Sequence, residues 1–222
     1  EEELTVFDRP ALLAQQAEDA QNHVDEVLDR PISFHYMEHG VYLKRRNRAE
    51  ADYIAQLVRS LLKQPRKVSI GIVAFSEAQQ NEIEMALQRL AQDDADFMEA
   101  LETEYEREED GEFVGLLVKN LENIQGDERD LVIMSVCYGY NEEGRMFMNF
   151  GPINKSGGEK RLNVAFSRAK HHMALVSSIR DYDITNDYNH GANCLKNYIR
   201  YASAVSEGNI PAVQNVLRDL AR

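Results

Sequence analysis

Two arginines in one short segment have the spacing and the chemistry to bind phosphate. Arg161, Ala165 and Arg168 follow one another at i, i+4 and i+7. This spacing predicts that the two arginines lie on one face of a helix, two turns apart. Arginine suits phosphate because its guanidinium stays charged and its planar fork matches phosphate oxygens. We therefore expect a basic helical face beside the carboxyl end of a parallel strand, where open α/β sheets place their ligands.

Two apolar runs lie next to the charged segments. Leu131–Cys137 and Met173–Val176 are short and nearly continuous, as expected of strands buried on both faces of a parallel sheet. A Gln125-Gly126 turn and then four charged residues come before the first run. The charged helix candidate comes before the second run. The pattern predicts strands that alternate with helices, and hence an α/β domain.

The remaining elements follow from periodicity and capping signals. Asn47 with Glu50, and Ser76 with Gln79, resemble capping boxes that begin two helices. We expect one amphipathic helix over residues 8–29 and a helical acidic insertion near 92–112. Further helices are expected over 192–206 and 213–220. Strands are expected over 32–35, 67–75 and 113–118.

Composition and charge limit the possible functions. The chain has 222 residues, a net charge of −13 and two cysteines, Cys137 and Cys194. Two cysteines are too few for a disulfide framework, which favours a reducing, cytoplasmic setting. No apolar run approaches the roughly 18 residues of a membrane span, so no membrane partner is expected. Because the chain begins with Glu, we expect it to be part of a longer protein.

The acidic total hides a local basic region. Asp93–Glu112 contains eleven acids and one base, whereas Lys44–Lys67 contains eight bases and two acids. Because a local patch decides where phosphates bind, the net charge does not exclude nucleic acid. Each run could also be no more than a solvated helix face.

Four segments, in order, resemble motifs of one protein family. Gln125–Val136 resembles motif V and Gly157–Val176 resembles motif VI of superfamily 1 DNA/RNA helicases. Ser69–Glu84 is similar to motif IV, and Gly40–Val58 is similar to the stretch just ahead of it. The most similar branch contains the nonsense-mediated-decay RNA helicase and its bacterial relatives.

The resemblance implies an α/β, RecA-like P-loop NTPase fold, with a mostly parallel sheet and helices on both faces. The chain contains no G-x-x-x-x-G-K-[ST] phosphate loop and no Asp-Glu metal pair after a strand. It would therefore be the second RecA-like domain, inactive without its first domain. ATP with Mg²⁺ is expected to bind with the help of that first domain, which would hold the metal ligands. We expect a helical lead-in at 1–35, the RecA-like domain at 36–180 and a helical extension at 181–222.

The same resemblance implies roles for individual residues. Arg168 matches the arginine finger of motif VI, and Arg161 matches the first arginine of that motif. Gln125, Gly126 and Glu128 match the motif V residues near the nucleotide. Gln80 stands where relatives often carry another arginine, which leaves Arg168 with less help at the γ-phosphate.

The expected partner is single-stranded DNA or RNA, bound without sequence preference through its phosphates. Ser76, Asn120 and Asn123 match the positions at which the family contacts phosphates, although Ser76 could simply cap a helix. Two alternatives remain open. The chain could be a catalytically weak binding module that docks partners through its acidic segment. It could also be a metal-dependent nuclease that uses Asp127, Glu128 and Asp130.

Overall fold

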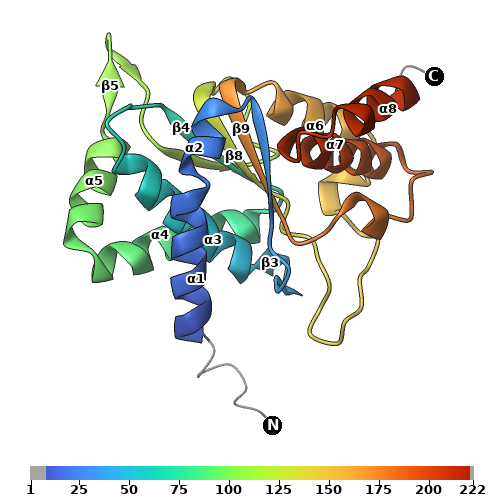
Figure 1. Ribbon diagram of the computed structural model, residues 1–222, viewed down its shortest axis with the longest axis horizontal. Coiled ribbons are helices and arrows are strands. Elements are labelled where there is room, and N and C mark those ends of the chain that lie inside the picture. Colours follow the sequence, from blue (N-terminus) through green and yellow to red (C-terminus); the bar gives the residue numbers. More distant parts are fainter. Residues whose placement is uncertain (1–8, 221–222) are drawn as a thin grey trace.

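A five-stranded parallel sheet forms the centre of the molecule (Figure 1). The computed structural model describes residues 9–220. The sheet has the order β1-β9-β8-β4-β7, and every neighbouring pair is parallel. Its strands are β1 (Ile32–Tyr36), β4 (Ile70–Ala74), β7 (Leu117–Asn120), β8 (Arg129–Ser135) and β9 (Ala169–Ser177).

Side chains of the central strands alternate between two apolar cores. Ile72 and Ile133 face one core, which packs against α3 (Arg48–Leu62) and α4 (Glu77–Asp93). Val132 and Met134 face the other core, which packs against α6 (Gly158–Phe166) and α7 (His190–Ser206). The period of two in burial follows from the pleat of a strand. The predicted α/β fold, with helices on both faces of the sheet, is confirmed.

The amino-terminal helix is broken where one continuous helix was expected. α1 (Arg9–Asn22) and α2 (Val24–Asp29) meet at His23, and residue 8 of the expected helix lies outside the described residues. Nδ1 of His23 lies 2.9 Å from the Tyr53 hydroxyl, which in turn lies 2.8 Å from Nδ1 of His35. This polar contact with β1 and α3 occupies the point of the break.

The acidic insertion contains α5 (Ala95–Tyr105) and a small hairpin of β5 (Glu108–Glu109) and β6 (Glu112–Phe113). The prediction of one strand over 113–118 was wrong. At Gly115 the chain passes so close to the Glu104 carbonyl that an added Cβ would lie 1.9 Å from that oxygen. The strand of the main sheet therefore begins only at Leu117.

The carboxyl-terminal helices agree with the periodic pattern, with small shifts at their starts. α7 begins at His190 rather than residue 192, because the Asn189 side chain caps it by accepting from Ala192 N. α8 (Ile210–Leu220) begins three residues earlier than expected. The Asn209 side chain accepts a hydrogen bond from Ala212 N, and Pro211 is tolerated in a first helical turn. Residues 221–222 of the expected extension lie outside the described residues.

The parallel strands give the sheet two chemically distinct edges. We call the end at Ala74, Asn120, Ser135 and Ser177 the carboxyl edge, and the end at Ile70, Arg129 and Ala169 the amino edge. The hairpin of β2 (Tyr42–Leu43) and β3 (Arg46–Asn47) lies at the carboxyl edge, at the lower end of the sheet in Figure 1. The β5–β6 hairpin lies toward the opposite end. The described residues also form two 3-10 turns, at Gly151–Ile153 and Asp181–Asp183.

Candidate functional site

Arg168 lies at the amino edge, not on a helical face. α6 ends at Phe166, so the predicted helical face shared by the two arginines was wrong. The Arg168 carbonyl accepts a hydrogen bond of 3.1 Å from Arg129 N of β8, and the chain enters β9 at the next residue. Arg161 lies in the first half of α6, whereas Arg168 lies beyond the carboxyl end of this helix. The prediction that Arg168 lies beside the carboxyl end of a parallel strand was also wrong.

The Arg168 guanidinium points back toward the carboxyl end of the preceding helix, α6. Nε donates to the Val164 carbonyl at 3.0 Å, and one terminal nitrogen donates to Ser167 Oγ at 2.9 Å. The carboxyl end of a helix carries partial negative charge, which favours a cation there. The other terminal nitrogen lies 3.8 Å from the Glu128 carboxylate. The structure therefore brings together Arg168 and Glu128, which come from the two segments that resemble motifs VI and V.

The other predicted nucleotide-side residues are not part of this pair. Arg161 donates to the Ser156 carbonyl at 3.1 Å, at the start of α6. Gln125 is exposed. Gly126 has a φ of +92° and open space where a Cβ would stand. A glycine is thus favoured at position 126 because of the backbone conformation, and not because another group of this chain approaches closely.

The short segment 121–128 runs from the carboxyl edge to the amino edge. It leaves β7 at Asn120 on the carboxyl edge and enters β8 at Arg129 on the amino edge. Leu121 and Ile124 are buried against the core on the α6 side, which holds the segment against that face of the sheet. Asn123 is exposed on it.

At the carboxyl edge, two of the three predicted phosphate contacts are engaged within the protein. Ser76 is 4% exposed, and its hydroxyl accepts from Gln79 N and donates to the Arg45 carbonyl at 2.5 Å. Asn120 is 7% exposed, and its amide donates to Gln80 Oε1 at 2.9 Å. Gln80 therefore lies at the carboxyl ends of the strands, whereas Arg168 lies at their amino ends. Asn123 alone of the three is exposed.

A buried carboxylate at the carboxyl edge was not predicted from the sequence. Glu50 is fully buried, and its two oxygens accept hydrogen bonds of 2.7–3.0 Å from Ser135 Oγ, Cys137 N, Ser178 N and Ser178 Oγ. Burial raises the pKa of this carboxyl to about 7, although the bonds that it accepts act in the opposite direction. Glu50 thus ties the start of α3 to the ends of β8 and β9.

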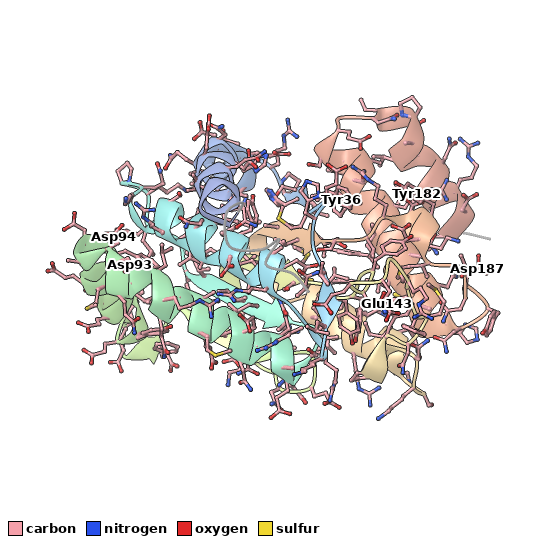
Figure 2. The ribbon with its side chains drawn as sticks, turned by 90° about the horizontal axis from the view of Figure 1, so that it is seen from below. Tyr36, Asp93, Asp94, Glu143, Tyr182 and Asp187 are labelled. Atoms are coloured by element: carbon pink, nitrogen blue, oxygen red, sulfur yellow. The ribbon has the colours of Figure 1, made fainter. Side chains whose placement is uncertain are left out.

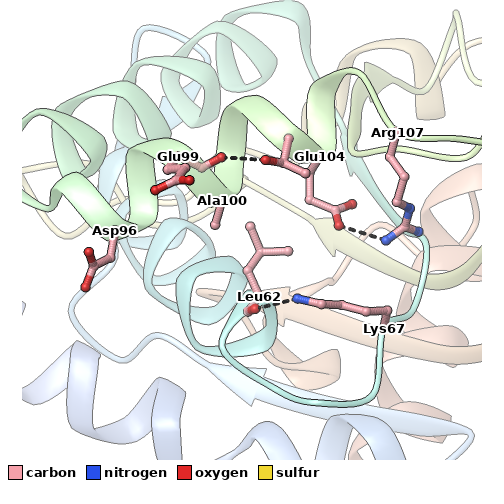
Figure 3. A pocket seen from close by; sticks show the side chains of 8 residues that line it. Leu62, Lys67, Asp96, Glu99, Ala100, Glu104 and Arg107 are labelled. Atoms are coloured by element: carbon pink, nitrogen blue, oxygen red, sulfur yellow. Dashed lines mark hydrogen bonds and ion pairs between the residues drawn. The ribbon is translucent and has the colours of Figure 1, made fainter.

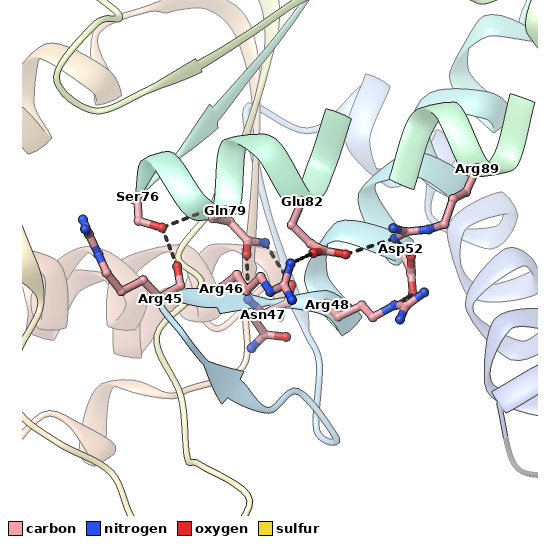
Figure 4. A network of polar contacts seen from close by, with 9 residues as sticks. All are labelled: Arg45, Arg46, Asn47, Arg48, Asp52, Ser76, Gln79, Glu82 and Arg89. Atoms are coloured by element: carbon pink, nitrogen blue, oxygen red, sulfur yellow. Dashed lines mark hydrogen bonds and ion pairs between the residues drawn. The ribbon is translucent and has the colours of Figure 1, made fainter. Parts of the chain in front are cut away.

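Gln79 of α4 likewise connects its helix to β3 and to the end of β8 (Figure 4). Its side-chain oxygen accepts from Asn47 N at 2.6 Å, and its nitrogen donates to the Asn47 carbonyl and to Ser135 Oγ, both at 2.9 Å. The cap residues Asn47 and Ser76 do accept from the backbone of Glu50 and Gln79, as predicted. The reciprocal half of each capping box is replaced, because both side chains bond to other elements. The two capping patterns indicated Glu50 and Gln79 in the sequence, but no sequence pattern indicated that their side chains bond to Ser135.

The chain is similar to proteins of one known family. The model of the AAA domain family matches residues 12–180. The chain belongs to the AAA domain family. It is 36% identical over 172 residues to an uncharacterized ATP-dependent helicase of Mycoplasma genitalium, and 35% identical over 174 residues to its homolog in Mycoplasma pneumoniae. These matches cover 76% and 75% of the chain but only 14% of each relative, so the chain spans a small part of their length. The predicted resemblance to helicases is confirmed.

A solved structure also matches this AAA domain. It is the C-terminal domain of a possible DNA helicase from Lactobacillus plantarum. The match covers 73% of this chain and 84% of the other, with a TM-score of 0.39 and 16% identity.

Asp130, at the amino edge of the AAA domain, is engaged by contacts within the chain. Asp130 accepts from Ser69 N and Ser69 Oγ, both at 2.9 Å, and so joins β4 to β8. Among residues 9–220 no group of three His, Cys, Asp or Glu side chains is placed to hold a metal ion. The arrangement that the nuclease alternative requires is therefore not formed by the described residues. No described helix is long and apolar enough to cross a membrane.

A hollow of about 510 Å³ lies beside α5 (Figure 3). Two of its charged side chains form an ion pair, since Glu104 lies 2.7 Å from Arg107. Lys67 donates to the Leu62 carbonyl at 2.9 Å, whereas Asp96 and Glu99 are exposed. Asp93 and Asp94, at the start of this acidic insertion, lie far from Tyr36 and Tyr182 when the molecule is seen from below (Figure 2). The acidic insertion is thus separate from the carboxyl edge.

Proposed function

We propose that this chain is the C-terminal, second RecA-like motor domain of an ATP-dependent helicase or translocase. The observation that carries the proposal is the Arg168–Glu128 pair at the amino edge. Arg168 is oriented by two hydrogen bonds, while its remaining nitrogen has only the exposed Glu128 at 3.8 Å. A surface ion pair of this kind contributes about 0–1 kcal/mol, so a phosphate can replace Glu128 at little cost.

In this proposal ATP binds between the amino edge and a first RecA-like domain. Phosphoryl transfer requires cations aimed at the γ-phosphate, and an arginine supplied from a neighbouring domain can serve this purpose. Arg168 would provide that cation, and Glu128 would hold it in place until the nucleotide arrives. Arg161 would support the loop at Ser156 rather than the phosphate. The Mg²⁺ ligands and the phosphate loop would come from the first domain.

Single-stranded DNA or RNA would bind at the carboxyl edge. Asn123 is exposed for such a contact, whereas Ser76 and Asn120 would hold the backbone that presents it. Segment 121–128, which contains Gln125 and Gly126, would then connect the nucleic acid at the carboxyl edge with the ATP at the amino edge. The free thiols of Cys137 and Cys194 suit a reducing cytoplasm.

The test is the ATPase rate of the whole protein that carries this domain, measured with single-stranded nucleic acid. Arg168→Ala should lower kcat on the order of 10³-fold, since a transferring arginine contributes about 10³–10⁵ in rate. Arg168→Lys should recover little activity, because a lysine lacks the planar fork. Arg200→Ala is the matched control, because Arg200 pairs with Asp219 at 2.9 Å on the α7–α8 surface. An unchanged rate in Arg168→Ala would remove this residue from the mechanism.

A binding module without catalysis is the second candidate. Gln80 favours it, because this position lacks the arginine that relatives often carry and its amide bonds to Asn120 instead. A wild-type protein that binds single strands but hydrolyses no ATP would select this candidate. Nucleic-acid-stimulated hydrolysis would exclude it.

A further inference from the structure

The β2–β3 hairpin ends in two basic residues that the sequence resemblance did not assign. Lys44 and Arg45 form its two-residue turn, and both are exposed. Their φ angles are +51° and +65°, in the left-handed region. Such turns normally carry Asn and Gly, because other residues are strained there. The sequence therefore places two long cations where the backbone would favour small residues.

The hairpin is held firmly against the carboxyl edge. Ser76 Oγ donates to the Arg45 carbonyl, and Gln79 bonds to both backbone groups of Asn47 (Figure 4). Arg46 lies 2.7 Å from Glu82 of α4. Tyr42 N donates to the Tyr140 carbonyl, in the loop that follows β8. These contacts leave the tip little freedom, so its two side chains project from a rigid base.

The basic residues of the hairpin region differ in whether they have acidic partners. Arg46 pairs with Glu82, and Arg48 lies 3.5 Å from Asp52. Within residues 9–220, Lys44 and Arg45 form no ion pair. Two exposed cations without carboxylate partners are available to an external anion.

The surroundings of the tip indicate which anion it would contact. Arg45 lines a small hollow with Ser76 and Asn120, the end residues of the carboxyl edge. The carboxylates of Glu77 and Glu122 line the same hollow, which favours a path for phosphates along the outer, hairpin side. A chain of phosphates that follows the carboxyl edge would pass both cations.

We propose that Lys44 and Arg45 form a phosphate clamp for single-stranded nucleic acid at the carboxyl edge. This inference rests on the proposed function and extends it to two residues of the Gly40–Val58 segment to which the resemblance assigned no role. The contacts would be to the phosphodiester backbone and hence independent of sequence. Each phosphate contact to a single strand contributes about −0.7 to the slope of log K against log salt concentration.

The experiment measures binding of the 222-residue chain to labelled oligothymidylate and oligouridylate by fluorescence anisotropy, over a series of salt concentrations. Lys44→Asn/Arg45→Asn removes both charges and suits the left-handed turn, because Asn tolerates this conformation. We expect an affinity loss of about tenfold and a salt slope smaller by about 1.4, equally on both oligomers. Thermal unfolding of the same variant checks that the fold is retained.

Two further variants make the result specific. Lys63→Gln/Arg218→Gln removes the same number and kind of charges at exposed positions on α3's far end and α8, and should leave binding unchanged. Lys44→Arg/Arg45→Lys keeps both charges and should keep the slope. Equal losses in the Asn variant and in the control, or no loss in either, would overturn the clamp. If the wild type binds neither oligomer, the nucleic-acid part of the proposed function fails and the clamp fails with it.

Discussion

The two edges of the sheet are built in opposite ways. At the carboxyl edge, Glu50 and Gln79 are fully buried and bond to the ends of three other elements. At the amino edge, Arg168 and Glu128 form a 3.8 Å pair in which the Glu128 side chain is 52% exposed. The buried network of the carboxyl edge is satisfied within this chain, whereas the Arg168–Glu128 pair of the amino edge is exposed to groups outside it.

This difference shows in the free energies involved. A buried polar group left without its partner costs about 1–3 kcal/mol, whereas an exposed ion pair contributes about 0–1 kcal/mol. Changes to the buried network of Glu50 and Gln79 should therefore appear as lost stability, and changes to the Arg168–Glu128 pair as lost activity. We infer that the carboxyl edge is a rigid platform and the amino edge an adaptable contact. Each prediction below tests that division.

The largest expected effect is that of Glu50→Ala. The change leaves the hydroxyls of Ser135 and Ser178 and two backbone N–H groups without their acceptor. We expect the free energy of unfolding to fall by about 4 kcal/mol, measured by urea denaturation. Glu102→Ala, at an exposed position of α5, is the control and should change it by less than about 0.5 kcal/mol. A loss below about 1 kcal/mol in Glu50→Ala would show that the buried network is not the main stabilising feature of this edge.

The contrast between the edges also explains what the sequence could reveal. The apolar runs predicted the strands well, because a strand buried on both faces leaves a local signature. The caps at Asn47 and Ser76 were predictable for the same reason, since a cap involves residues three positions apart. Arg168 was placed on the wrong element, because where α6 ends depends on its backbone pairing with β8, which no local pattern shows.

The partners of Glu50 and Gln79 lie far away in sequence. Ser135 is 85 residues from Glu50 and 56 residues from Gln79, and Ser178 is 128 residues from Glu50. Helical periodicity cannot report contacts of this range. A polar residue three positions after a cap, predicted to lie on a buried helix, was the only available signal. Lys44 and Arg45 were visible as part of a basic run, but their rigid placement required the hairpin.

A smaller effect is expected from pH. The folded pKa of Glu50 is about 7, against an ordinary value of 4.5. Because the folded value is raised, the stability that Glu50 contributes is fully present below about pH 4.5 and is lost as the pH rises through about 7. The wild type should therefore lose about 3 kcal/mol relative to Glu50→Gln over this window. Urea denaturation of both proteins at several pH values measures the difference. A difference that is constant with pH, or that grows in favour of the wild type as pH rises, would contradict this assignment.

The smallest effect on stability is expected from Glu128→Gln at the amino edge. The pair with Arg168 is long and exposed, so the free energy of unfolding should change by less than about 0.5 kcal/mol. In the whole protein, the ATPase rate should nevertheless fall, because Arg168 loses the group that holds its free nitrogen. A double-mutant cycle separates positioning from an independent role. If Glu128 acts through Arg168, Glu128→Gln should add no further loss to Arg168→Ala. If the two losses add fully, Glu128 contributes by another route, and the amino edge has two independent functional groups rather than one held by the other.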